Sequence, residues 1–193
     1  MLISNFFITK ILNAIRSETD YDEDDIDMAR YSLQVVLWEL EKTVYLLLIF
    51  IILSHQWQFL AAMLSVMTIR PNAGGFHSST PWGCFWWTLL GFVLAIFALP
   101  YIPLDNITVL LVGLFSIVTT FIATPIRTLQ REKIADKSKD KSKKMIATSV
   151  TILWFTALFL KQDYFLAPAV MWIIFLQNFQ LLIEYLKWKK CNC

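Results

Sequence analysis

The chain has 193 residues, of which 57% are hydrophobic and 17% charged, and its formal net charge at pH 7 is +2. Long apolar runs with few internal charges are typical of a membrane-embedded protein, and they exclude an ordinary soluble domain. The three cysteines do not follow the spacing of a disulfide framework.

Residues 1–19 predict a short amphipathic helix that lies in the membrane interface. Apolar side chains such as Phe7 and Ile11 recur there at helical spacing, with Lys10 and Arg16 among them. An acidic stretch at residues 20–27 follows, and it favours the start of the next helix because carboxylates stabilise a helix N-terminus.

Further apolar runs predict transmembrane or membrane-embedded helices. They cover residues 43–53, 59–69, 84–99, 107–124, 145–160 and 164–186. The first two fall short of the roughly 20 residues that span a bilayer core, unless polar ends or tilt extend them. We therefore predict an all-α, polytopic integral membrane protein with about six such helices. All of them belong to a single domain, residues 1–193.

The basic residues predict the orientation of these helices. An even number of spans places both termini on one side of the membrane. The loop at residues 70–84, the connector at residues 125–144 and the C-terminal tail share that side. Every Lys and Arg except Lys161 falls on it. By the positive-inside rule, this side is cytoplasmic.

The segment from Arg70 to Cys84 carries the candidate chemistry, and its glycines and prolines predict a loop. Cys84 is expected to open an apolar helix, whose N-terminus favours the reactive thiolate. His77 is placed to take the thiol proton as general base and to return it to a leaving amine. Gly74 and Gly75 let the backbone approach a substrate or supply N–H groups to an oxyanion.

The spacing of the His and the Cys sets a condition on this interpretation. A continuous helix would separate His77 from Cys84 by about 10 Å, too far for a hydrogen bond. Pro81 and Gly83 argue against a continuous helix and let the chain fold back. The competing interpretation is that Cys84 only packs and His77 is only solvated.

The pattern Arg70-x2-Ala73-Gly74-Gly75-x-His77-x6-Cys84 resembles the signature of the AgrB family, the accessory gene regulator protein B of Gram-positive bacteria. The chain length, the interfacial N-terminal helix and the number of apolar segments also resemble this family. So does the basic connector that follows Thr124-Pro125-Ile126. The resemblance therefore covers essentially the whole chain.

The resemblance implies a cysteine endopeptidase of the bacterial cell membrane that processes a small AgrD-type propeptide. Cys84 is then the nucleophile that cuts behind the future signal peptide and holds it as a thioester, and His77 is its base. An internal Cys or Ser of the precursor next displaces Cys84. The product is a cyclic thiolactone or lactone, a quorum-sensing autoinducing peptide. Arg70 and Gly75 match motif positions expected to support activity. A homodimer is compatible with the family, and no cofactor is implied.

The connector at residues 125–144 is a second candidate surface. Its cations predict capture of an acidic precursor tail or of anionic lipid in the bilayer. Arg127 and Arg131, beside the motif-like Thr-Pro-Ile, are the best candidates for substrate binding. The competing interpretation is a solvated loop that only sets topology. Because its charges lie in one membrane-flanked loop, the connector does not predict a nucleic-acid partner.

For the remaining polar residues, structural roles compete with functional ones or replace them. Glu39 and Glu41 lie near a bilayer boundary, where they either assist the His or Arg of the motif or only cap and snorkel. Cys191 and Cys193 lack the further ligands of a metal site, so no metal is predicted. His55 is expected to be structural.

Two rival functions are compatible with the composition. One is a non-enzymatic peptide exporter or transporter, in which the glycine-containing broken segment is a substrate site. The small size, the lack of repeats and the lack of an acidic relay within the spans argue against it. The other is a membrane scaffold that docks partners through the basic connector. A scaffold predicts that Cys84→Ala is harmless.

Overall fold

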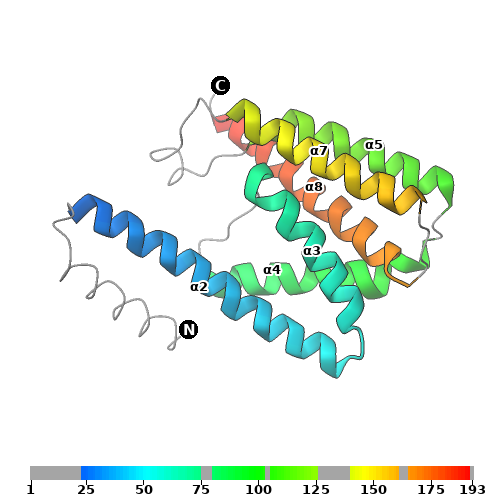
Figure 1. Cartoon of the computed structure of the whole chain (residues 1–193), viewed down its shortest axis with the longest axis horizontal. Coiled ribbons are helices and arrows are strands. Elements are labelled where there is room, and N and C mark those ends of the chain that lie inside the picture. Colours follow the sequence, from blue (N-terminus) through cyan, green and yellow to red (C-terminus); the bar gives the residue numbers. More distant parts are fainter. Residues whose placement is uncertain (1–22, 75–79, 103–104, 126–139, 161–164, 192–193) are drawn as a thin grey trace. The chain divides into compact units, whose positions relative to one another are not determined.

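The computed structural model describes residues 23–74, 80–102, 105–125, 140–160 and 165–191, and all regular structure in these ranges is helical. The α-helices are α2 (Glu23–Ile52), α3 (Gln56–Ala73), α4 (Pro81–Val93), α5 (Asn106–Ala123), α7 (Asp140–Leu160) and α8 (Ala167–Cys191) (Figure 1). The predicted all-α class is thereby confirmed. The predicted interfacial helix, residues 1–19, lies outside the described residues.

Within the described residues, four helical stretches are long and apolar enough to cross a membrane. They are Trp82–Tyr101, Asn106–Ala123, Asp140–Leu160 and Ala167–Lys190. Large apolar side chains on them are exposed in the structure, as at Ile107 (66%) and Leu153 (67%), which suits contact with lipid. These helices confirm a polytopic membrane protein.

The chain forms two compact units that divide between Ser54 and His55. Ser54 adopts φ 60° in the turn after α2, and His55 is the N-cap of α3, so the apolar runs predicted at residues 43–53 and 59–69 belong to different helices. The first unit contains α2 and the second contains every other described helix. A single domain over the whole chain stays a prediction.

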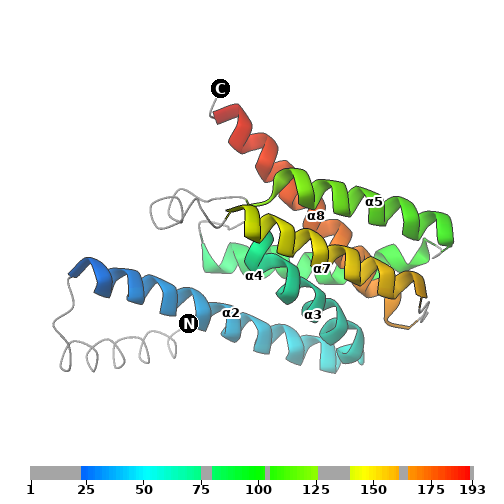
Figure 2. The same ribbon diagram turned by 45° about the horizontal axis from the view of Figure 1, so that its top comes forward.

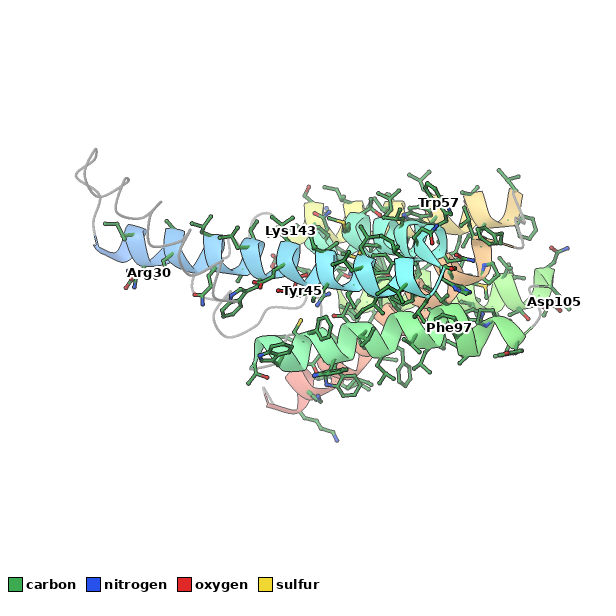
Figure 3. The ribbon with its side chains drawn as sticks, turned by 90° about the horizontal axis from the view of Figure 1, so that it is seen from below. Arg30, Tyr45, Trp57, Phe97, Asp105 and Lys143 are labelled. Atoms are coloured by element: carbon green, nitrogen blue, oxygen red, sulfur yellow. The ribbon has the colours of Figure 1, made fainter. Side chains whose placement is uncertain are left out.

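In the second unit, α5 packs against α7 and α8, and α3 packs against the same two helices. Successive helices run in alternate directions (Figures 1 and 2). Figure 3 accordingly shows Lys143, near the start of α7, at the opposite end of this unit from Trp57, Phe97 and Asp105. The ends of α3, α5 and α8 therefore meet the starts of α4 and α7 at one end.

Two hydrogen bonds between side chains join these helices, one buried and one exposed. The Thr120 hydroxyl of α5 donates to Asn178 Oδ1 of α8 at 2.6 Å, and both residues are fully buried. The Trp154 indole of α7 donates to Thr68 Oγ1 of α3 at 2.9 Å. Because an apolar bilayer offers no competing partner, such bonds fix which helix faces meet.

The loop boundaries that were predicted from proline differ from the observed helix ends. α3 continues through Pro71 to Ala73 and α4 already begins at Pro81, so both ends of the predicted loop at residues 70–84 are helical. After α4 the chain continues through a π turn (η1, Leu94–Ala98) and a 3-10 turn (η2, Leu99–Tyr101) that contains Pro100. Proline lacks an N–H, and local changes in hydrogen bonding accommodate it in membrane helices.

The start of α5 gives a testable prediction about stability. The Asp105 carboxylate accepts a hydrogen bond from the Thr108 N–H at 2.9 Å, and hydrogen bonding from Thr108 holds the pKa of Asp105 below its ordinary value. We expect Asp105→Ala to lower the thermal midpoint of the purified protein at pH 7, because the helix loses its cap.

The pH dependence of this effect follows from the lowered pKa. The cap stabilises the fold above the ordinary Asp pKa, and this contribution is lost as the pH falls through the lower folded value. The difference between wild type and Asp105→Asn, which keeps a neutral acceptor, should therefore change only at acidic pH. A constant difference from pH 7 to pH 3 would contradict the assignment.

Candidate active site

Cys84 lies in the first turn of α4 (Pro81–Val93). The sequence predicted that Cys84 is the first residue of this helix, but the helix already begins at Pro81. Thr80 is the N-cap, and its hydroxyl accepts a hydrogen bond from the Gly83 N–H at 3.1 Å. Pro81 occupies the first helical position, where its missing N–H costs nothing. Thr80 itself is extended (φ −124°, ψ 142°), so residues 77–84 do not form one continuous helix, as the sequence predicted.

The first turn of α4 fixes Cys84 by its backbone. The Cys84 N–H donates to Thr80 O at 3.1 Å, and Cys84 O accepts from the Thr88 hydroxyl at 2.7 Å. Its thiol is reduced and half-buried. The N-terminal end of a helix carries a partial positive charge, and Cys84 lies close to that end of α4.

α3 ends at Gly74 in a conformation that favours glycine. Gly74 has φ 83° and ψ −162°, a region of backbone space that only glycine occupies readily. Its N–H donates to Arg70 O at 2.9 Å and closes the helix. This N–H is therefore engaged within the helix end, whereas the sequence suggested it as an oxyanion donor.

An open cleft connects the end of α3, the start of α4 and the middle of α8. Its polar lining consists of Arg70, Cys84, Thr88, Gln177 and Gln180, and Trp87 and several aliphatic side chains supply the rest. The structure thus brings together two of the predicted site residues, Arg70 and Cys84. A thiol and a guanidinium in one partly apolar cleft suit chemistry on a carbonyl or another anion-forming group.

Four of the predicted site residues lie outside the described residues. They are His77, Gly75, Arg127 and Arg131. Their roles stay predictions. Among the described residues, no cluster of three or more His, Cys, Asp or Glu side chains is arranged to hold a metal ion.

The other candidate residues make local contacts. Glu39 pairs with Lys42, and Glu41 accepts a hydrogen bond from Tyr45 at 3.2 Å, all within α2. His55 packs against Phe97 near the end of η1, with ring centroids 4.6 Å apart and the rings tilted by 51°.

Sequence reasoning missed the wall of the cleft that α8 provides. Gln177 and Gln180 lie inside a long apolar helix, between Ile173 and the charged tail. A usable signal was present, because polar side chains within a membrane span are costly and are frequently functional. What the sequence alone does not show is which face of α8 meets Cys84.

The fold and the cleft define a class: a polytopic α-helical membrane protein with a thiol at the rim of a cleft near one end of its helix bundle. Comparison with known proteins identifies the family. The family model described as AgrB, accessory gene regulator B, matches residues 8–181, so the chain belongs to this family. Membership supports a role in accessory gene regulator quorum sensing.

Relatives of modest identity extend the match over nearly the whole chain. AgrB-like protein 1 of Clostridium perfringens (strain 13 / Type A) is 22% identical over 179 residues, which cover 93% of this chain and 96% of that protein. An AgrB-like protein of Clostridium beijerinckii is 25% identical over 160 residues, covering 82% and 78%. No solved structure matches the chain.

Proposed function

We propose that the chain is a membrane cysteine endopeptidase that cleaves a small AgrD-type propeptide and releases its signal segment as a cyclic thiolactone or lactone. The observation that carries this proposal is the position of Cys84, in the first turn of α4 and in an open cleft with Arg70. A thiol that only packed the helix would not need access to such a cleft.

The proposed reaction has two acyl transfers. Cys84 Sγ, deprotonated by His77, attacks the carbonyl carbon of the scissile peptide bond and forms a tetrahedral oxyanion. This intermediate collapses to a thioester on Cys84, and His77 returns the proton to the departing amine of the C-terminal tail. An internal thiol or hydroxyl of the precursor then attacks the thioester, closes the ring and restores the Cys84 thiol. No water is consumed, so a site partly shielded by the membrane favours cyclisation over hydrolysis.

Charged residues around the cleft support this assignment. Arg70 lines the cleft beside Cys84, where a cation stabilises a developing oxyanion or holds a carboxylate. We assign Arg127 and Arg131 of the connector to the acidic tail of the precursor, and Gly75 to the close approach of the substrate backbone. These three assignments rest on the sequence pattern.

The distribution of charge supports a cytoplasmic site. In the described part of residues 55–193, every Lys and Arg lies at the end of the bundle where α4 begins. They are Arg70, Lys141, Lys143, Lys144, Lys187, Lys189 and Lys190. The positive-inside rule then assigns Cys84 and the C-terminus to the cytoplasmic side of the cell membrane.

Trapping the thioester tests the proposal directly. The purified protein in lipid vesicles is mixed with the peptide encoded by the short reading frame beside its own gene, then quenched in acid and weighed intact. We expect a transient adduct equal to the precursor without its tail, released by hydroxylamine as a thioester should be. The same adduct should still form in a Cys191→Ser/Cys193→Ser variant, where Cys84 is the remaining thiol. Cleavage without any adduct would overturn the acyl-enzyme mechanism.

A further inference from the structure

α8 presents one face to the cleft that contains Cys84. Ile173, Leu176, Gln177 and Gln180 line the cleft, and their spacing of three and four residues is that of one helix face. Two amide side chains therefore lie on an otherwise apolar wall. A neutral amide in a membrane helix is costly unless it forms hydrogen bonds.

Gln177 has an unused hydrogen-bond acceptor. Its Oε1 atom is buried and has no hydrogen-bond partner in the structure. The neighbouring Asn178 is a useful contrast, because its Oδ1 accepts from Thr120 and its Nδ2 donates to Ile174 O at 2.9 Å. The same helix thus satisfies the amide of Asn178 and leaves the amide oxygen of Gln177, a residue that lines the cleft, without a partner.

The chemistry of the cleft indicates what completes this hydrogen bond. A peptide that reaches Cys84 in extended form brings backbone N–H groups into a partly apolar site, where they also need acceptors. An uncharged amide oxygen can accept a hydrogen bond from a backbone N–H of the precursor. The identity of the precursor residue does not matter, because the contact is with its backbone and not with its side chain. The terminal torsion of glutamine is soft, so rotation about it can bring Oε1 to the cleft at low cost.

We propose that Gln177 is a substrate-binding residue that accepts a hydrogen bond from a backbone N–H of the precursor next to its scissile bond. The proposal rests on the proposed function, since it names a contact of the same cleft. The bond holds the scissile carbonyl in reach of Cys84, so its loss reduces productive binding more than it reduces stability.

The first test compares two matched substitutions. Gln177→Met removes the amide at nearly constant volume, and Gln58→Met does the same on α3, where Gln58 Oε1 is also buried without a partner but does not line the cleft. With the full-length protein in vesicles, we expect Gln177→Met to lower kcat/KM for precursor cleavage about tenfold. Gln58→Met should stay within about twofold of wild type. Equal losses in both variants would overturn the proposal.

The second test separates substrate contact from any structural effect. Synthetic precursors carry a single backbone ester, which lacks the N–H, at each of the three residues on either side of the scissile bond, which itself stays an amide. At one position the ester should slow wild-type cleavage about tenfold and have no further effect in Gln177→Met. If every ester affects both proteins equally, Gln177 makes no such contact.

The two proposals fail in different ways. If Cys84→Ala still cleaves the precursor, the peptidase assignment is wrong and the Gln177 contact falls with it. If Cys84→Ala is inactive while the ester series gives the same result in wild type and Gln177→Met, the peptidase assignment stands and only the Gln177 contact is refuted.

Discussion

Cys84→Ala should leave the precursor uncut, with at least a roughly 10³-fold loss of cleavage rate. The substitution removes the nucleophile, and no other described Cys, Asp or Glu lines the cleft to replace it. It deletes one half-buried sulfur at a helix start, so the thermal midpoint should change little. Co-expression with an N-terminally tagged precursor, followed by its mass, measures the result. His77→Ala is expected to give the same uncut precursor.

The control for this result is the Cys191→Ser/Cys193→Ser variant, which keeps Cys84 and should cleave as wild type. If Cys84→Ala cleaves normally and the tail variant does not, the nucleophile lies in the C-terminal tail. If all variants, Cys84→Ala included, mature the precursor equally, the chain acts as an exporter or scaffold beside another protease.

Gly113→Ala should destabilise the bundle by about 1–3 kcal/mol. A Cβ at Gly113 of α5 would lie 2.9 Å from Cδ1 and 3.2 Å from Cγ of Phe155 on α7. These atoms belong to a rigid, buried ring, so the two helices must separate to admit a methyl group. Small residues allow this kind of close approach between membrane helices. A lower thermal midpoint in detergent would show the effect.

Gly91→Ala is the matched control for Gly113. Gly91 also lies inside a helix, but its added Cβ meets only Ile173 Cδ1 at 3.8 Å, an ordinary contact. Alanine there should be at least as stable as glycine, since it restricts the unfolded chain. If the two alanine variants melt alike, the Gly113–Phe155 contact does not limit the approach of α5 to α7.

The sequence predicted the helices well because each is an apolar run, and lipid requires every backbone group in a span to bond within a helix. It predicted helix ends poorly where proline was taken as a break. Pro81 begins α4 and Pro71 lies within α3. Local composition does not distinguish these positions, because the outcome depends on caps such as Thr80 and on what the helix packs against.

The candidate site also contains residues that local sequence identifies and one that only tertiary packing reveals. Arg70 and Cys84 were found from their spacing in one short motif, and the structure places both on the cleft. Gln177 follows Cys84 by 93 residues and Arg70 by 107, and no local sequence pattern connects it with them. Only the packing of α8 against α3 and α4 brings this amide to the thiol.

The buried bond between Thr120 and Asn178 has a consequence for the cleft, although neither residue lines it. Consecutive residues of a helix point about 100° apart, so holding Asn178 against α5 sets the rotational phase of α8. With that phase fixed, Gln177 faces the cleft and cannot swing toward lipid without breaking the bond. The hydrogen bond from Thr120 of α5 thus fixes the rotation of α8 about its axis. It thereby keeps Gln177 on the cleft, although Thr120 itself lies on another side of α8.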